Sequence, residues 1–174
     1  MRLLTALLFA AFAHAEVLDS AAGGFTVKTT VNIKAAPEDV YRKLVHDIGE
    51  WWSPIHTFSG DAHNLRIEDR PGGCLCEKLA HDGFARHLEV IAVEPGKRIL
   101  MSGAMGPMQT MAATGTLQFQ VTPAEGGTKL DAIYAIGGYF PKGTNTWTSP
   151  VDRMLTDQCA RLKSYVETGH AESK

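Results

Sequence analysis

Acid–base chemistry is the first possibility that the residue types of this 174-residue chain suggest. His87 lies in the middle of an alternating, strand-like run, and runs of the same kind carry Glu77, Asp131 and Tyr134. An imidazole held by a carboxylate or a phenol can act as a general base near neutral pH. If its side chain points inward, His87 is therefore the candidate catalytic residue for a keto substrate. The alternative is a hydrogen-bonded surface histidine.

The three cysteines offer a second kind of chemistry. Cys74 and Cys76 are two apart on an expected strand, so their thiols share a face at a separation of roughly 7 Å along the strand. That separation is too long for a bond between them without distortion of the strand, so a disulfide from one of them to Cys159 is the alternative to buried free thiols. With His81 or His87 the pair could form a zinc set. A Cys-x-Cys pair alone is weak support for zinc, and we expect no metal.

Four methionines follow within a short glycine-containing segment, at Met101, Met105, Met108 and Met111. Flexible thioethers suit a loop that repacks around apolar ligands. Thioethers at this spacing are also the soft donors that Cu(I) prefers. We interpret the segment as the lining of an apolar cavity or core.

Aromatic residues flank the same region. Trp51 and Trp52 lie where a helix gives way to the strands, and Tyr139, Phe140 and Trp147 precede the last helix. A tryptophan can stack on a ligand and offer its indole N–H, and we expect one of the pair to line a pocket while the other packs. The candidate ligand-binding residues are therefore Trp51, Trp52, Cys74, Cys76, His87, Met101, Met105, Met108, Tyr139 and Trp147.

Charge and missing motifs exclude several classes of function. The formal net charge is −2, whereas nucleic-acid binders usually carry a basic stripe. The sequence contains no GxSxG, HExxH, P-loop or dinucleotide fingerprint, so nucleophilic hydrolysis and nucleotide chemistry are not indicated. A small hydrophobic ligand is the expected partner, with no cofactor and no nucleic acid.

The N-terminus has the pattern of a secretory signal peptide. Arg2 supplies one positive charge, residues 3–12 form an apolar run, and Ala13-His14-Ala15 has the small-x-small form that signal peptidase cleaves. The run is shorter than the about 20 apolar residues that span a membrane, so we expect no stable membrane insertion. A buried first helix is the alternative. We expect a periplasmic or secreted protein, cleaved near Ala15, with a signal peptide (1–15), a linker (16–22), one domain (23–169) and a tail (170–174).

Alternation with a period of two predicts that most of the domain is strand. The first strand covers 23–34, and six more, separated by turn residues, cover 65–70, 74–80, 85–93, 98–102, 115–122 and 128–137. Pro37 and two acidic residues begin a helix of about ten residues, which a short helical turn follows. Ser149-Pro150 begins an amphipathic helix of about 18 residues that ends at Gly169.

An antiparallel sheet of seven strands with one apolar face needs a cover. Only the last helix is apolar and long enough. We therefore expect an α+β fold in which the curved sheet surrounds the C-terminal helix. That helix cannot fill the whole concavity, so an apolar ligand pocket is the default hypothesis.

This order of elements, together with AAPEDVY (35–41), Trp51-Trp52, PGG (71–73) and EPGKRI (94–99), resembles the START-like (SRPBCC) superfamily over about residues 24–168. The chain is most similar to the polyketide cyclase/dehydrase and Hsp90-activator-like members. The resemblance implies a helix-grip fold with a deep cavity between sheet and helix. It also implies binding of lipids, sterols, plant hormones or polyketides, with cyclisation or dehydration in some members. The superfamily has no universal catalytic residues, so none is carried over.

The leading hypothesis is an exported protein that binds a small hydrophobic ligand, lipid or polyketide-like, in its cavity. The alternative is a cyclase- or dehydratase-like enzyme that uses an acid–base residue of the cavity. A third hypothesis is a protein-interaction module like the Hsp90-activator relatives. Export disfavours it, because that partner is absent outside the cytoplasm.

Overall fold

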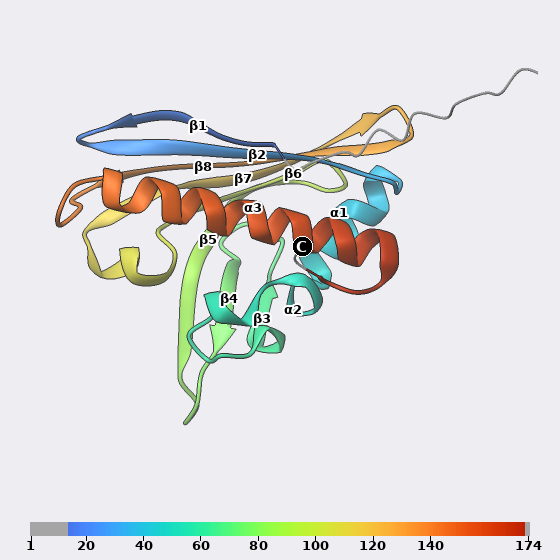
Figure 1. Ribbon diagram of the computed structural model, residues 1–174. Helices are drawn as coiled ribbons and strands as arrows, with labels where there is room; N and C mark the ends of the chain where they lie inside the picture. Colours follow the sequence, from blue (N-terminus) through green and yellow to red (C-terminus); the bar gives the residue numbers. More distant parts are fainter. Residues whose placement is uncertain (1–13, 173–174) are drawn as a thin grey trace, which may run out of the picture.

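In the computed structural model, which describes residues 14–172, eight strands and three α-helices form a helix-grip fold (Figure 1). The strands are β1 (His14–Ala21), β2 (Gly24–Ile33), β3 (Leu65–Ile67), β4 (Cys74–Lys78), β5 (Phe84–Glu94), β6 (Arg98–Ser102), β7 (Ala113–Ala124) and β8 (Gly127–Gly138). The helices are α1 (Pro37–His46), α2 (Ile48–Trp51) and α3 (Asn145–Thr168). Most of the expected signal peptide, residues 1–13, lies outside the described residues.

All eight strands belong to one antiparallel sheet in the order β1-β2-β8-β7-β6-β5-β4-β3. In Figure 1, β1, β2 and β8 run above α3, while β5, β4 and β3 curve downwards past the helix. The sheet therefore wraps around α3, as the sequence predicted. The concave side formed by β3, β4 and β5 is the side on which the site lies.

The prediction of seven strands was wrong by one. Residues 16–22, expected to be a linker, lie mostly in β1, which pairs with β2 from His14 opposite Thr30 to Ala21 opposite Gly24. The strand lies at the sheet edge, and its side chains from Glu16 to Ala21 are exposed. It therefore lacks the alternation of buried and exposed residues on which the prediction of strands depends.

Helix α1 begins where the sequence predicted. Pro37 occupies its first turn, and Glu38 and Asp39 place negative charge at the positive end of the helix dipole. One face of the helix is buried, through Val40, Tyr41, Leu44 and Val45. This face holds α1 against α3 and β7 at one end of the core.

Helix α3 begins at Asn145, one turn before the predicted start at Ser149. The prediction placed Pro150 in the first turn, where no backbone N–H is needed. In the structure Pro150 lies further inside the helix and leaves the carbonyl of Thr146 without its helical donor. Thr146 is exposed, so water can satisfy that carbonyl. Gly169 ends the helix as predicted, with a φ of 82°.

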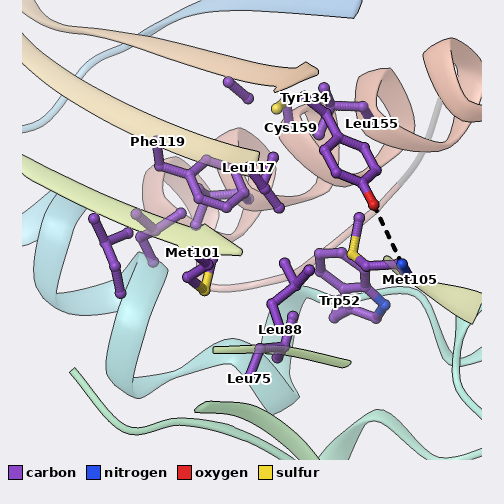
Figure 2. Packing of buried hydrophobic residues seen from close by; sticks show 14 of the residues in the cluster. Trp52, Leu75, Leu88, Met101, Met105, Leu117, Phe119, Tyr134, Leu155 and Cys159 are labelled. Atoms are coloured by element: carbon purple, nitrogen blue, oxygen red, sulfur yellow. Dashed lines mark hydrogen bonds between the residues drawn. The ribbon is translucent and has the colours of Figure 1, made fainter. Parts of the chain in front are cut away.

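The core lies between the sheet and α3. Leu155, Cys159 and Leu162 of α3 are at most 1% exposed, and Figure 2 shows the first two beside the ring of Tyr134 from β8. Burial raises the pKa of Tyr134, so its hydroxyl stays protonated. That hydroxyl accepts a hydrogen bond from the N–H of Met105 at 3.2 Å. The methionine-containing segment is thereby attached to the core.

Candidate ligand-binding site

A cavity of about 390 Å³ lies between α3 and the concave side of β3, β4 and β5, within the size range of small-molecule pockets. We call it the grip cavity. Most of its lining side chains are apolar or aromatic, and the polar exceptions are His56, Thr57 and His87. The complete lining is Trp52, Ile55, His56, Thr57, Phe58, Leu65, Leu75, His87, Met105, Gly106, Pro107, Met108, Trp147, Pro150, Val151 and Met154.

His87 and Glu77 form a buried pair on the wall of the grip cavity. His87 Nε2 lies 2.8 Å from Glu77 Oε2, and the two side chains are 7% and 0% exposed. The backbone N–H groups of Phe58 and Ser59 also donate to this carboxylate. The Phe58 ring packs against the imidazole, with 5.1 Å between the ring centroids. Three donors therefore converge on one buried carboxylate.

A β-bulge places His87 in this position. Leu75 of β4 pairs with Leu88 of β5, but the next residue, Cys76, pairs with Arg86, so His87 has no partner on β4. The extra residue breaks the strict alternation of sides, and His87 and Leu88 are both buried although they are consecutive. Bulges re-aim side chains in this way and are enriched beside active sites.

The protonation of the His87–Glu77 pair follows from its hydrogen bonds. Burial acts to raise the pKa of Glu77, but the hydrogen bonds from Ser59, Phe58 and His87 together hold that pKa below its ordinary value. Glu77 is therefore ionised at neutral pH and can only accept. Nε2 of His87 accordingly carries the proton that lies between the two side chains, so the tautomer of a neutral imidazole here has its lone pair on Nδ1. Within residues 14–172, the one hydrogen bond of the His87 ring is that of Nε2.

Two hydrogen bonds hold Trp52 in the cavity wall, one from its own indole and one from the backbone of the next residue, Ser53. The indole N–H donates to the backbone carbonyl of His56 at 3.1 Å, and the N–H of Ser53 donates to Oε1 of Gln158 on α3 at 2.9 Å. Trp51 packs edge-on against Trp52, with 5.5 Å between the ring centroids, and is 1% exposed. Trp52 thus faces the cavity while Trp51 packs behind it.

The structure divides the ten candidate ligand-binding residues into two groups. Those that line the grip cavity are Trp52, His87, Met105, Met108 and Trp147. Of the others, Met101 is fully buried in the core and Tyr139 is 68% exposed on the surface. Trp51, Cys74 and Cys76 are buried outside the lining. The cavity therefore uses about half of the residues selected by type.

Of the three partners considered for His87, the structure brings only Glu77 to it. Asp131 lies on the outer face of the sheet, where it forms ion pairs with Lys28 and Lys129 at 3.3 and 3.1 Å. The hydroxyl of Tyr134 is engaged by the backbone near Met105. Residue type alone did not distinguish these three, because the bulge in β5 determines which of them the imidazole of His87 reaches.

The expectation that Cys74 and Cys76 do not bond to each other was wrong, because they form a disulfide. Their Cα atoms are 5.3 Å apart, instead of the roughly 7 Å of a regular strand. The contraction of β4 lies opposite the bulge of β5, where the two strands leave regular geometry. Cys159 is a buried free thiol, and burial raises its pKa to about 12.

The zinc sets considered from the sequence, Cys74 and Cys76 with His81 or His87, do not assemble. The disulfide removes the two thiolates that a zinc set with His81 or His87 would need. Within residues 14–172, no three His, Cys, Asp or Glu side chains are placed to hold a metal ion. The methionines lie in different places: Met101 is in the core, whereas Met105 and Met108 line the cavity.

Sequence analysis missed several cavity residues. Ile55 and Phe58, which are 80% and 50% exposed, lie in an irregular segment whose conformation no periodic pattern predicts. Met154 could have been found from its spacing to Val151 on the apolar side of α3. Leu75 could not, because alternation places it on the face opposite Cys74 and Cys76, which were the expected lining residues.

Residues 24–167 match the family model described as polyketide cyclase / dehydrase and lipid transport. The chain belongs to this family. The match extends from β2 into the last turn of α3, and it confirms the resemblance to the START-like (SRPBCC) superfamily. The helix-grip domain of the structure and the matched region are therefore nearly the same segment.

Solved structures share this fold at low sequence identity. A conserved protein of unknown function from Enterococcus faecalis is 15% identical, with a TM-score of 0.62, over 92% of this chain and 80% of that one. CalU16 from Micromonospora echinospora is 14% identical, with a TM-score of 0.56, over 95% and 88%. DynU16, a protein in the dynemicin biosynthetic locus, is 18% identical, with a TM-score of 0.58, over 84% and 48%. These likenesses establish the fold.

No curated protein matches the sequence. Among residues 14–172, no helix has both the length and the apolar character that crossing a membrane requires.

Proposed function

We propose that this member of the polyketide cyclase / dehydrase and lipid transport family binds a small hydrophobic molecule, lipid or polyketide-like, in the grip cavity. One observation carries the proposal: a cavity of about 390 Å³ whose lining is predominantly apolar and aromatic. Such surface is stabilised by contact with an apolar guest, since burial contributes about 25 cal/mol per Å² of apolar area. Met105, Met108 and Met154 can adapt their shape to that guest.

A neutral fluorescent probe tests this proposal. N-phenyl-1-naphthylamine should bind the wild-type protein with an increase in emission, and Val151→Phe should weaken binding at least tenfold, because the larger ring occupies cavity volume. Val166→Phe is the matched control, since Val166 lies on the same helix outside the lining. Thermal unfolding checks that both variants fold. Probe binding that is absent, or equal in the two variants, would contradict the proposal.

The His87–Glu77 pair favours a second candidate function, acid–base catalysis of the cyclase or dehydratase type on the bound ligand. A carboxylate-oriented imidazole with a free nitrogen is the arrangement that proton abstraction beside a carbonyl needs. Deuterium exchange at the carbon next to the carbonyl of 2-tetralone measures such a step. Exchange that is no faster with wild type than with His87→Phe would leave only the binding function.

We further propose that the protein is exported. The signal-like N-terminus supports this, and so does the Cys74–Cys76 disulfide, because disulfides persist in oxidising compartments. N-terminal sequencing should show that the mature chain begins at Glu16. Ala15→Glu should block this cleavage, because signal peptidase requires a small residue there. A mature wild-type chain that still begins at Met1 would disprove cleavage.

A further inference from the structure

We infer that the ligand of the grip cavity is a neutral aromatic molecule with a hydroxyl group that donates its hydrogen bond to Nδ1 of His87. This inference rests on the proposed function and narrows it from an apolar guest to one with a donor at a defined place. His87 is then the residue that determines specificity, and Glu77 is the residue that positions it.

The hydrogen-bonding direction follows from the buried pair. Glu77, at 0% exposure, already accepts from Phe58, Ser59 and His87, and an ionised carboxylate has no proton to give. His87 therefore presents the proton of Nε2 to Glu77, and the neutral imidazole with that tautomer offers the lone pair of Nδ1 to a guest. An acceptor inside a mostly apolar cavity is costly to leave unpaired, so a guest that donates to it is favoured over one that cannot.

The rest of the lining leaves few other polar contacts. The Trp52 indole N–H is engaged by the carbonyl of His56, and the Thr57 hydroxyl donates to the carbonyl of Pro54 at 2.7 Å. Burial lowers the pKa of His56, against a weaker opposing effect of Asp157, so this ring is neutral at neutral pH. Among the described residues of the lining, His87 is the buried polar side chain that has a ring nitrogen, Nδ1, without a hydrogen bond.

The charge of the site excludes anionic guests. Among the described residues, the lining contains no lysine and no arginine, while the ionised Glu77 lies directly behind His87. A carboxylate placed at Nδ1 would meet a lone pair and a nearby negative charge, without a cation to compensate. Fatty acids and other carboxylates should therefore bind worse than neutral molecules of the same size.

The shape and chemistry of the walls favour an aromatic guest. Trp52, Phe58 and Trp147 supply ring faces, and Met105 and Met154 supply thioethers, which contact aromatic rings favourably. Phe58 packs on the imidazole of His87, so at least one of these ring faces adjoins Nδ1 and Nε2 directly. A planar ring can contact these walls while its hydroxyl reaches Nδ1.

Three ligands that differ in one group test the inference: 2-naphthol, 2-methoxynaphthalene and 2-naphthoate, each measured by calorimetry at neutral pH. Wild type should bind 2-naphthol about tenfold more tightly than 2-methoxynaphthalene, which lacks the donor. It should bind 2-naphthoate at least tenfold more weakly than 2-naphthol. His87→Phe should remove the preference for the hydroxyl, while His63→Phe, a control at an exposed histidine outside the lining, should keep it.

Nitrogen-15 NMR of the wild-type imidazoles gives a measurement that does not depend on a folded variant. One ring should show a protonated Nε2 and an unprotonated Nδ1, and the Nδ1 resonance should shift when 2-naphthol is added. Equal binding of 2-naphthol and 2-methoxynaphthalene to wild type would overturn the inference and leave the apolar cavity function standing. If none of the three ligands binds, and the neutral probe does not bind either, the proposed function fails as well.

Discussion

Replacement of Glu77 by alanine is expected to lower the free energy of unfolding by about 2–5 kcal/mol, because each buried donor left without its acceptor costs about 1–3 kcal/mol. Glu77 is fully buried and is the acceptor for the N–H groups of Phe58 and Ser59 and for His87. Alanine leaves these three donors without that acceptor and also leaves a cavity. Urea unfolding followed by circular dichroism measures the loss.

Two controls sharpen this result. Glu125→Ala, at an exposed turn, should change the free energy of unfolding by less than about 0.5 kcal/mol. Because the pKa of Glu77 is lowered in the fold, its carboxylate contributes stability that is complete above its ordinary value of 4.5 and is lost as the pH falls through the lower folded-state pKa. The difference between wild type and Glu77→Ala should therefore shrink in acid below that value. A loss under 1 kcal/mol at neutral pH would contradict the buried pair.

Replacement of Leu155 by alanine should cost about 3–4 kcal/mol, the usual result of emptying a fully buried leucine site. Leu155 is 0% exposed on α3, and Figure 2 shows it beside Tyr134 and close to Cys159 in the gap between helix and sheet. The sheet is held by its own hydrogen bonds and cannot collapse into the space. Denaturant unfolding measures this change in the free energy of unfolding, provided that the m-value is the same in wild type and variant.

The matched control for Leu155 lies on the opposite side of the same helix. Arg153→Ala should leave stability within about 0.5 kcal/mol of wild type, because Arg153 is exposed. Equal effects of the two variants would show that the gap between helix and sheet is not closely packed at Leu155.

Periodicity predicted the fold because most elements have one buried face. Strand β2 buries every second residue from Phe25 to Ile33, and the sequence pattern found it within one residue of each end. Strand β1 was missed because its side chains are exposed, so no pattern marks it. The start of α3 was missed because Pro150 normally marks a first turn, and whether an unpaired carbonyl can reach water is a property of the folded surface.

The site was predictable only in part. Residue type selected Trp52, Met108 and Trp147 as candidate ligand-binding residues, and all three line the grip cavity. Residue type could not identify Glu77 as the partner of His87, and it could not predict the Cys74–Cys76 disulfide. Both depend on a departure from regular strand geometry. A period-two pattern assumes regular strands, so it fails where β4 and β5 become irregular.

The unpaired position of His87 also bears on how such a site can arise or disappear in evolution. Strands β4 and β5 match residue for residue on either side of His87, with Leu75 opposite Leu88 and Cys76 opposite Arg86. Deletion of the His87 codon alone would rejoin these pairs into a continuous ladder and remove the imidazole, leaving Glu77 with the backbone donors of Phe58 and Ser59. Relatives that differ by one residue in this hairpin can therefore keep the same fold and the same grip cavity. They would gain or lose the imidazole in that cavity through a single codon insertion or deletion.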